Sequence, residues 1–113
     1  MISDSSIADD AERLLAAEGA VARAFAARAQ APGGYEVRPQ QLEMARQVGA
    51  SLSSGRHALL EAGTGVGKSY AYLVPALCWA VENEACVAVA TSTIALQEQL
   101  FRRDLPLLAE ALP

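Results

Sequence analysis

Apolar residues recur at helical spacing through the first part of the chain. Between residues 7 and 29, the positions that predict one helical face are Ile7, Leu14, Leu15, Val21 and Phe25. We expect one helix or two here, with Gly19 as the break, and Ser6 with Asp9 three residues later is typical of a helix N-cap. The pattern predicts helices that pack on another part of the protein, and it indicates no function for them.

A second helical pattern follows the segment QAPGGYEV, residues 30–37, where a proline and two glycines predict a linker. Pro39 suits the first turn of a helix, and apolar side chains then recur every three or four residues as far as SSG at residues 53–55. We therefore expect a helix over residues 39–53.

Two short apolar runs have the composition of buried strands. They are HALLE at residues 57–61 and CVAVAT at residues 86–91, the second rich in small and β-branched side chains. Between them a mostly apolar helix is expected from Lys68 to about Glu82, with a bend or an early end at Pro75. Strand, helix and strand in this order predict two parallel strands joined by a right-handed crossover.

The last part of the chain is expected to be helical. Ser92 or Thr93 can cap a helix that begins at Ile94 and stops before Pro106, and a short helix follows through Leu112. The predicted fold class is therefore α/β, with a partial parallel sheet flanked by helices and preceded by an alanine-rich helical segment.

Composition and charge change this picture little. The chain has 113 residues, of which 52% are hydrophobic and 5% aromatic, which indicates a globular protein whose core is alanine, leucine and valine. Its 13 acidic and 9 basic residues give a net charge of −4. Binding to nucleic acid would therefore need a local patch, because the surface as a whole is not basic.

The cysteines and the apolar runs exclude some classes of protein. Cys78 and Cys86 have only His57 as a possible further zinc ligand, so we expect both to be small buried hydrophobes. The longest uncharged apolar run, from Tyr70 to Val81, is shorter than the roughly 20 residues that span a bilayer. The chain also opens with acidic residues where a signal peptide would be basic. We expect a cytoplasmic protein that binds no membrane.

The most informative stretch is AGTGVGKS, residues 62–69, between the first predicted strand and its helix. Glycine permits positive φ and close approach of a ligand, while the free amides and the dipole at a helix start favour an anion. Phosphate is the expected ligand, with Lys68 on the β and γ phosphates and the Ser69 hydroxyl on Mg²⁺. The alternative is a glycine turn that only joins a strand to a helix.

Three motifs carry a resemblance to a known family. The stretch has Ala62 where the general phosphate-loop pattern has glycine, and in this form it resembles motif I of superfamily 2 helicases. YEVRPQQLEMA, residues 35–45, resembles the Q motif, and VATSTIALQEQLFRRDLPLL, residues 89–108, resembles motif Ia with its following helix. Together they resemble the bacterial DinG-type DNA helicases, relatives of XPD, over residues 35–113.

The resemblance implies two parts and a set of site residues. Residues 1–34 would be a helical extension with its linker, and residues 35–113 an incomplete ATP-binding domain of the RecA-like P-loop type. The implied ATP site consists of Arg38, Gln41, Gly63, Thr64, Gly65, Val66, Gly67, Lys68 and Ser69. Lys68 would be the catalytic residue, Ser69 the Mg²⁺ ligand, and Gln41 the hydrogen-bond partner of adenine. Arg38, with Tyr35 as a further candidate, would pack against the base.

These roles suit the side chains that would perform them. An amide satisfies both the donor and the acceptor of adenine, and a guanidinium plane stacks on a base. The other interpretation of Arg38 and Gln41 is that they are solvated residues in the first turn of a helix.

The resemblance also implies contact with single-stranded DNA, through Thr91, Ser92, Thr93 and Gln97. Hydroxyls and helix-start amides suit phosphate contacts, which carry no sequence information. Simple helix capping explains Ser92 or Thr93 equally well.

Hydrolysis of ATP needs more than a phosphate cradle. The 113 residues contain no D-E-x-H motif, no arginine finger of a second motor domain, and no cluster of four cysteines; an iron–sulfur cluster would belong to another part of such a helicase. We expect these residues alone to bind ATP weakly and to hydrolyse little, while hydrolysis in the complete helicase drives translocation on single-stranded DNA. The alternatives are a stand-alone nucleotide-binding or interaction module and a small P-loop kinase. The oligomeric state is not predicted.

Overall fold

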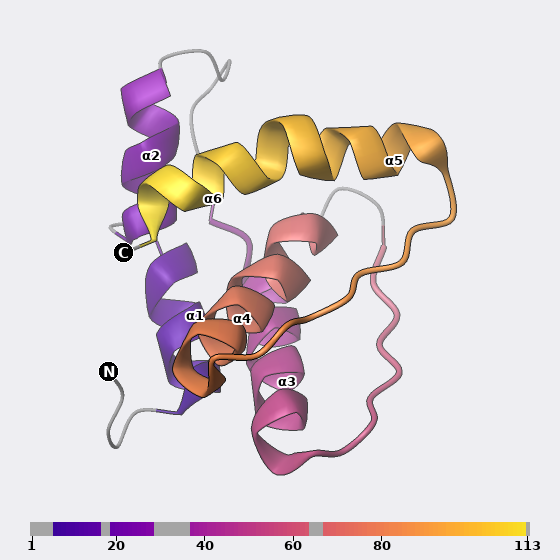
Figure 1. Cartoon of the computed structure of the whole chain (residues 1–113). Coiled ribbons are helices and arrows are strands. Elements are labelled where there is room, and N and C mark those ends of the chain that lie inside the picture. The colour runs from indigo at the N-terminus through magenta and orange to yellow at the C-terminus, as the bar shows by residue number, and fades with distance from the viewer. Residues whose placement is uncertain (1–5, 17–18, 29–36, 64–66, 113) are drawn as a thin grey trace.

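Helices make up all the regular structure in the described part of the chain. The computed structural model describes residues 6–16, 19–28, 37–63 and 67–112 (Figure 1). Its elements are α1 (Ile7–Leu15), α2 (Ala20–Arg28), α3 (Pro39–Ser54), α4 (Lys68–Asn83), α5 (Ile94–Gln99), the π-helical turn η1 (Leu100–Asp104) and α6 (Leu105–Ala111).

The first two helices confirm the predicted break and the predicted cap. The Ser6 hydroxyl accepts a hydrogen bond from the Asp9 amide at 3.1 Å at the start of α1. Gly19 directly precedes α2, and a Cβ at this position would lie 2.4 Å from the Leu14 carbonyl oxygen. Because backbone cannot move aside as a flexible side chain can, this turn requires glycine.

The two long helices are also close to their predicted bounds. Helix α3 begins at Pro39 and ends at Ser54, and the C-cap residue Gly55 has a left-handed φ of 71°. Helix α4 runs from Lys68 to Asn83 with Pro75 buried inside it, so of the two predicted effects of Pro75, a bend or an early end, the early end is wrong.

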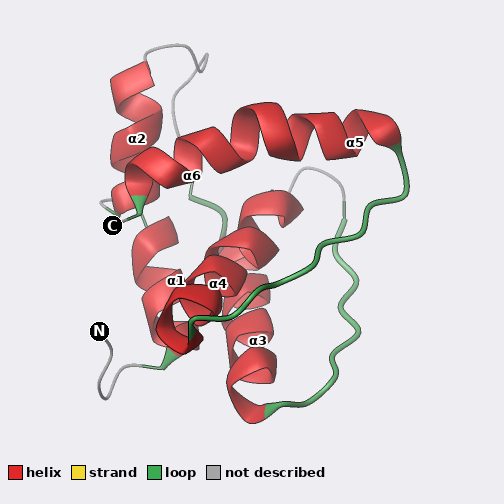
Figure 2. Cartoon of the chain, in the orientation of Figure 1, coloured by secondary structure: helices red, strands yellow, loops and turns green. Residues whose placement is uncertain are grey.

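The predicted parallel sheet is wrong. No strand occurs in the described residues. The predicted strands 57–61 and 86–91 lie in two loops without strand pairing, the first extended segment (residues 56–63) and the second extended segment (residues 85–93) (Figure 2). Leu59 is 99% exposed and Val89 is 42% exposed. A helix makes its hydrogen bonds within one segment, whereas a strand takes them from neighbours, and two strands alone are marginal. The RecA-like α/β fold class is therefore replaced by a helical architecture.

The C-terminal helices form one nearly continuous rod (Figure 1). The Thr93 hydroxyl caps α5 by accepting a hydrogen bond from the Leu96 amide at 3.1 Å, which confirms one of the two predicted caps. The predicted stop before Pro106 is wrong, because η1 carries the chain into α6 through a bond from the Leu105 amide to the Leu100 carbonyl. Pro106 then lies in the first turn of α6, directly after this π-helical turn.

The core joins the N-terminal helices to the rest of the molecule. Helices α1, α3 and α4 pack on one another, and α2 packs on α6. The buried side chains shared by these contacts are alanine, leucine and valine, as predicted: Ala11, Leu15, Val21, Ala24, Ala45, Leu73, Val74, Leu100, Leu107 and Leu108. Cys78 is partly buried, but Cys86 is exposed, so the prediction of two buried cysteines is wrong for Cys86. No helix in the described ranges is long and apolar enough to cross a membrane.

Candidate functional site

The start of helix α4 is open and uncapped. Gly67 occupies the N-cap position with a left-handed φ of 78°, and no side chain makes a capping hydrogen bond there. The first amides of a helix have no acceptor within the helix, and the helix dipole makes this end positive. Lys68 is exposed and Ser69 is half-buried. This helix start can therefore receive an anion.

A buried amide from helix α3 contacts this helix start. Gln41 is 1% exposed, and its Nε2 donates a hydrogen bond to the Gly67 carbonyl oxygen at 3.0 Å. A Cβ on Gly67 would lie 2.2 Å from that Nε2 and 3.1 Å from a guanidinium nitrogen of Arg38. Position 67 thus favours glycine because of its φ, and any larger residue there would displace the ends of the Gln41 and Arg38 side chains. Gln41 is not the solvated first-turn residue of the alternative interpretation.

The structure brings together the first and last parts of the predicted nucleotide site. Arg38 and Gln41 lie against Gly67, and Lys68 and Ser69 follow in the first turn of α4. Within the described part of the chain, no ion pair involves Lys68. Of the remaining predicted residues, Gly63 ends the first extended segment. The others lie outside the described residues: Tyr35, Thr64, Gly65 and Val66.

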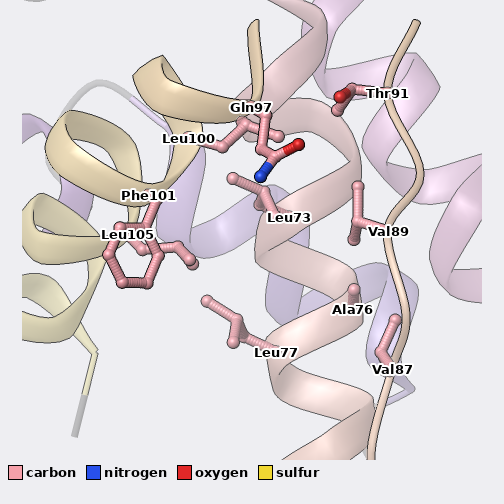
Figure 3. Close-up of a pocket in the computed structure, with 10 residues that line it drawn as sticks. All are labelled: Leu73, Ala76, Leu77, Val87, Val89, Thr91, Gln97, Leu100, Phe101 and Leu105. Atoms are coloured by element: carbon pink, nitrogen blue, oxygen red, sulfur yellow. The ribbon is translucent and has the colours of Figure 1, made fainter. Parts of the chain in front are cut away.

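Two of the predicted DNA contacts line a separate groove. Thr91 and Gln97 lie at one end of a groove of about 360 Å³, between α4, the second extended segment and the α5–η1 rod (Figure 3). Figure 3 shows that the rest of the lining is apolar, with Val87 and Val89 on one side and Phe101 on the other.

The hydroxyls at the start of α5 are partly engaged. The Thr93 hydroxyl caps this helix, and the Thr91 hydroxyl donates to the Thr93 carbonyl at 3.2 Å. Ser92 is exposed. Capping therefore accounts for Thr93, while Ser92 remains available to a ligand.

The sequence did not predict one cluster, which joins α1 to α3. One guanidinium nitrogen of Arg46 donates to Asp9 at 2.8 Å and to Glu12 at 2.7 Å. The hydrogen bond from Arg46 lowers the pKa of Asp9, and the same bond, followed by the one to Glu12, raises the pKa of Arg46. The partners are more than thirty positions apart, so no local pattern could have indicated the contact.

A second group lies where α1 faces α4. The buried Asp10 accepts a hydrogen bond from Arg13 at 3.1 Å through Oδ1, while its buried Oδ2 has no hydrogen-bond partner. Burial, followed by the charge of Asp10, raises the pKa of Cys78 to about 11. This thiol is therefore a poor nucleophile near neutral pH.

Comparisons with known proteins agree with the motifs. The DEAD/DEAH box helicase family matches residues 39–110. The chain is 52% identical over 80 residues to the ATP-dependent helicase DinG of Mycobacterium tuberculosis strain H37Ra, which covers 71% of this chain and 12% of that relative. It is 42% identical over 78 residues to the ATP-dependent DNA helicase DinG of Salmonella typhimurium strain LT2, covering 67% of this chain and 11% of the relative.

A third relative carries a different name. The chain is 38% identical over 80 residues to the 3'-5' exonuclease DinG of Bacillus subtilis strain 168, which covers 71% of this chain and 9% of that relative. No solved structure matches. These matches span at most 12% of the length of the relatives.

Proposed function

We propose, from the premise that this chain belongs to the DEAD/DEAH box helicase family, that it forms the ATP-binding part of a DinG-type DNA helicase. The observation that carries the proposal is the hydrogen bond from Gln41 to the Gly67 carbonyl at the uncapped start of α4. It joins the segment that resembles the Q motif to the segment that resembles motif I. The family match begins at residue 39, the first residue of α3, and includes both Gln41 and Gly67.

The proposed site holds the triphosphate of ATP at the start of α4. The backbone amides of Gly67, Lys68 and Ser69 are assigned to the phosphates, and the Lys68 ammonium neutralises the β and γ groups. We assign Gln41 to the adenine edge and Arg38 to the face of the base. Because the Gln41 amide is buried and bonded to the Gly67 carbonyl in this structure, binding of adenine requires the amide to exchange that bond for the base. The exposure of Lys68 and the lack of a capping side chain at Gly67 support this assignment.

Mg²⁺ fits the same helix start. The half-buried Ser69 offers a hydroxyl oxygen, the ligand type that Mg²⁺ prefers. In the described residues no group of three or more His, Cys, Asp or Glu side chains could cage a metal, so the ion would be held mainly by phosphate oxygens and water. The Ser69 hydroxyl would hold the ion, which would neutralise charge that develops on the phosphates.

The DNA-binding role belongs to the whole helicase. We assign backbone contacts on single-stranded DNA to Thr91, Ser92 and Thr93, at the end of the second extended segment, and to Gln97 in α5. ATP hydrolysis in the complete protein would drive translocation and unwinding. Because the 113 residues lack a D-E-x-H motif, we expect them alone to bind ATP without appreciable turnover.

The experiment that tests the proposal compares ATP binding by the chain and by Lys68→Ala, using calorimetry with Mg·ATP. Loss of the ammonium is expected to abolish measurable binding, because Lys68 is the only lysine of the chain and the charge that faces the β and γ phosphates. Arg56→Ala is the matched control, since it removes an exposed positive charge beyond the end of α3. Unchanged affinity in Lys68→Ala would overturn the phosphate assignment.

Base recognition is tested separately with Gln41→Ala. We expect this variant to lose preference for ATP over GTP, because the amide would no longer match the adenine edge. Affinities for the two nucleotides are measured side by side. An unchanged ratio would remove Gln41 from base recognition while leaving the phosphate site intact.

A further inference from the structure

Helix α1 lies outside the family match at residues 39–110, yet it is part of the packed core. Its apolar face is buried: Ile7 is 2% exposed, and Ala11 and Leu15 are 0% exposed. This face packs on α3 and α4, the two helices whose N-terminal turns meet at the candidate nucleotide site. The helix is therefore positioned to influence the site without touching it.

Helices α1 and α3 approach closely at Gly49. A Cβ added there would lie 2.8 Å from the Ala8 amide nitrogen and 2.9 Å from the Ala8 Cα. Both are backbone atoms of α1, which cannot turn aside as a side chain can. The absence of a side chain at position 49 therefore sets the distance between the two helices.

A charged contact sets the rotation of α1 against α3. Asp9 and Glu12 lie one turn apart on α1, and both accept hydrogen bonds from the same guanidinium nitrogen of Arg46. These side chains are exposed or half-buried, and such pairs add little to stability. Two acceptors on successive turns nevertheless fix one relative orientation of the helices.

One row of α3 connects these contacts to the nucleotide site. Gln41, Ala45 and Gly49 are the buried residues of α3, and their four-residue spacing places them on the same helical face. At one end of the row Gln41 bonds the Gly67 carbonyl, and at the other end Gly49 abuts Ala8. Because a helix moves largely as a rigid body, a shift of α1 at Gly49 displaces Gln41 as well.

We propose that α1 is a positioning element of the nucleotide site, whose contacts at Gly49 and Arg46 seat α3 so that Gln41 reaches the Gly67 carbonyl. The effect on nucleotide affinity rests on the function proposed above, whereas the positioning of the Gln41 side chain at the Gly67 carbonyl does not. The competing account is that α1 only contributes to global stability. The two accounts differ in what happens to Gln41 and to ATP at temperatures where every variant is folded.

The test uses Arg46→Glu, which turns the two attractive contacts into repulsions. It is compared with the double variant Arg46→Glu/Glu12→Arg, which restores one guanidinium between two carboxylates. Gly49→Ala probes the same interface through backbone distance. All variants are made in the 113-residue chain, and folding is verified by circular dichroism before binding is measured.

The first measurement is the side-chain amide signal of Gln41 in ¹H–¹⁵N spectra without nucleotide. We expect Arg46→Glu to move this signal toward that of a free amide, and the double variant to return it. The second measurement is affinity for Mg·ATP. We expect roughly three- to tenfold weaker binding in Arg46→Glu and Gly49→Ala, the range typical of residues that act through an intermediate element, with recovery in the double variant.

Two controls separate positioning from stability. Leu107→Ala removes a buried side chain of α6, outside the α1–α3 contact, and is expected to lower the melting temperature. Arg102→Glu breaks the exposed pair with Glu98. Both are expected to keep the Gln41 signal and the affinity for ATP.

The positioning proposal is overturned if Arg46→Glu leaves the Gln41 signal and the affinity for Mg·ATP as in the parent chain, even when its melting temperature falls. Should Gly49→Ala fail to fold, Arg46→Glu and its double variant decide alone. Lys68→Ala, run in the same series, reports on the proposed function: if it binds ATP normally, that function fails, and the Gln41 signal still decides the role of α1.

Discussion

The helical core and the two extended segments, residues 56–63 and 85–93, show opposite outcomes for similar apolar sequence. Leu108, in α6, is 0% exposed, whereas Leu59, in the first extended segment, is 99% exposed. The helix supplies its own backbone hydrogen bonds and needs partners only for one face. An extended segment needs neighbours for its backbone as well as for its side chains. Apolar composition therefore leads to burial only where backbone partners are present.

The largest expected difference between the two regions is in stability. Leu108→Ala should lower the free energy of unfolding by about 2–5 kcal/mol, because it leaves a cavity in a packed core. Leu59→Ala, the same substitution in the first extended segment, should change it by no more than about 0.5 kcal/mol. Urea unfolding of both variants checks this. Equal losses would show that the first extended segment packs in solution as tightly as the core.

The reactivity of the two cysteines tests the same difference between the helical core and the extended segments. Cys86 lies exposed in the second extended segment, whereas burial and the nearby Asp10 raise the pKa of Cys78 to about 11. Because only the thiolate reacts, we expect iodoacetamide at pH 8 to modify Cys78 at least about tenfold more slowly than Cys86. Peptide mapping by mass spectrometry gives both rates. Similar rates in the folded chain would contradict the difference in burial, and in urea the rates should converge.

The smallest expected effect concerns the contact between α1 and α3. The hydrogen bond from Arg46 lowers the pKa of Asp9 below its ordinary value of 3.8, so the folded state favours the charged carboxylate. The resulting stability is present above pH 3.8 and is lost as the pH falls through the lowered pKa.

Between pH 5 and pH 3 the melting temperature should therefore fall by roughly one or two degrees more in the parent chain than in Arg46→Met, because an exposed pair contributes little. Thermal melts at the two pH values measure the difference. An identical fall in both chains would show that the Asp9 contact does not form in solution.

The sequence predicted well those parts of the fold that are determined locally. Ser6, Gly19 and Thr93 act as the predicted caps or breaks, and α3 and α4 lie within a few residues of their predicted bounds. The predicted strands at 57–61 and 86–91 do not form in the described structure, since a strand depends on partners that its own sequence does not specify. Pro106 ended no helix, because a π-helical turn accommodates it.

The residues of the candidate site stay a prediction, and their arrangement could not be read from the sequence. Gln41 and Gly67 were identified through the resemblance of their motifs, but the bond between the Gln41 amide and the Gly67 carbonyl is visible only in the structure. The contacts of α1 with Gly49 and Arg46 join segments that are far apart in the sequence, and no motif indicates them. Contacts of this kind follow from packing, which a single sequence does not reveal.

The most direct test of the nucleotide site is a ¹H–¹⁵N titration of the 113-residue chain with Mg·ATP and, separately, with Mg·tripolyphosphate. We expect the backbone amides of Gly67, Lys68 and Ser69 to shift and saturate with both ligands, because the phosphates are common to them. The amides of the extended segments 56–60 and 85–90 should stay nearly unchanged. If the amides at 67–69 do not shift, or shift no more than those of the extended segments, the start of α4 is not a phosphate site.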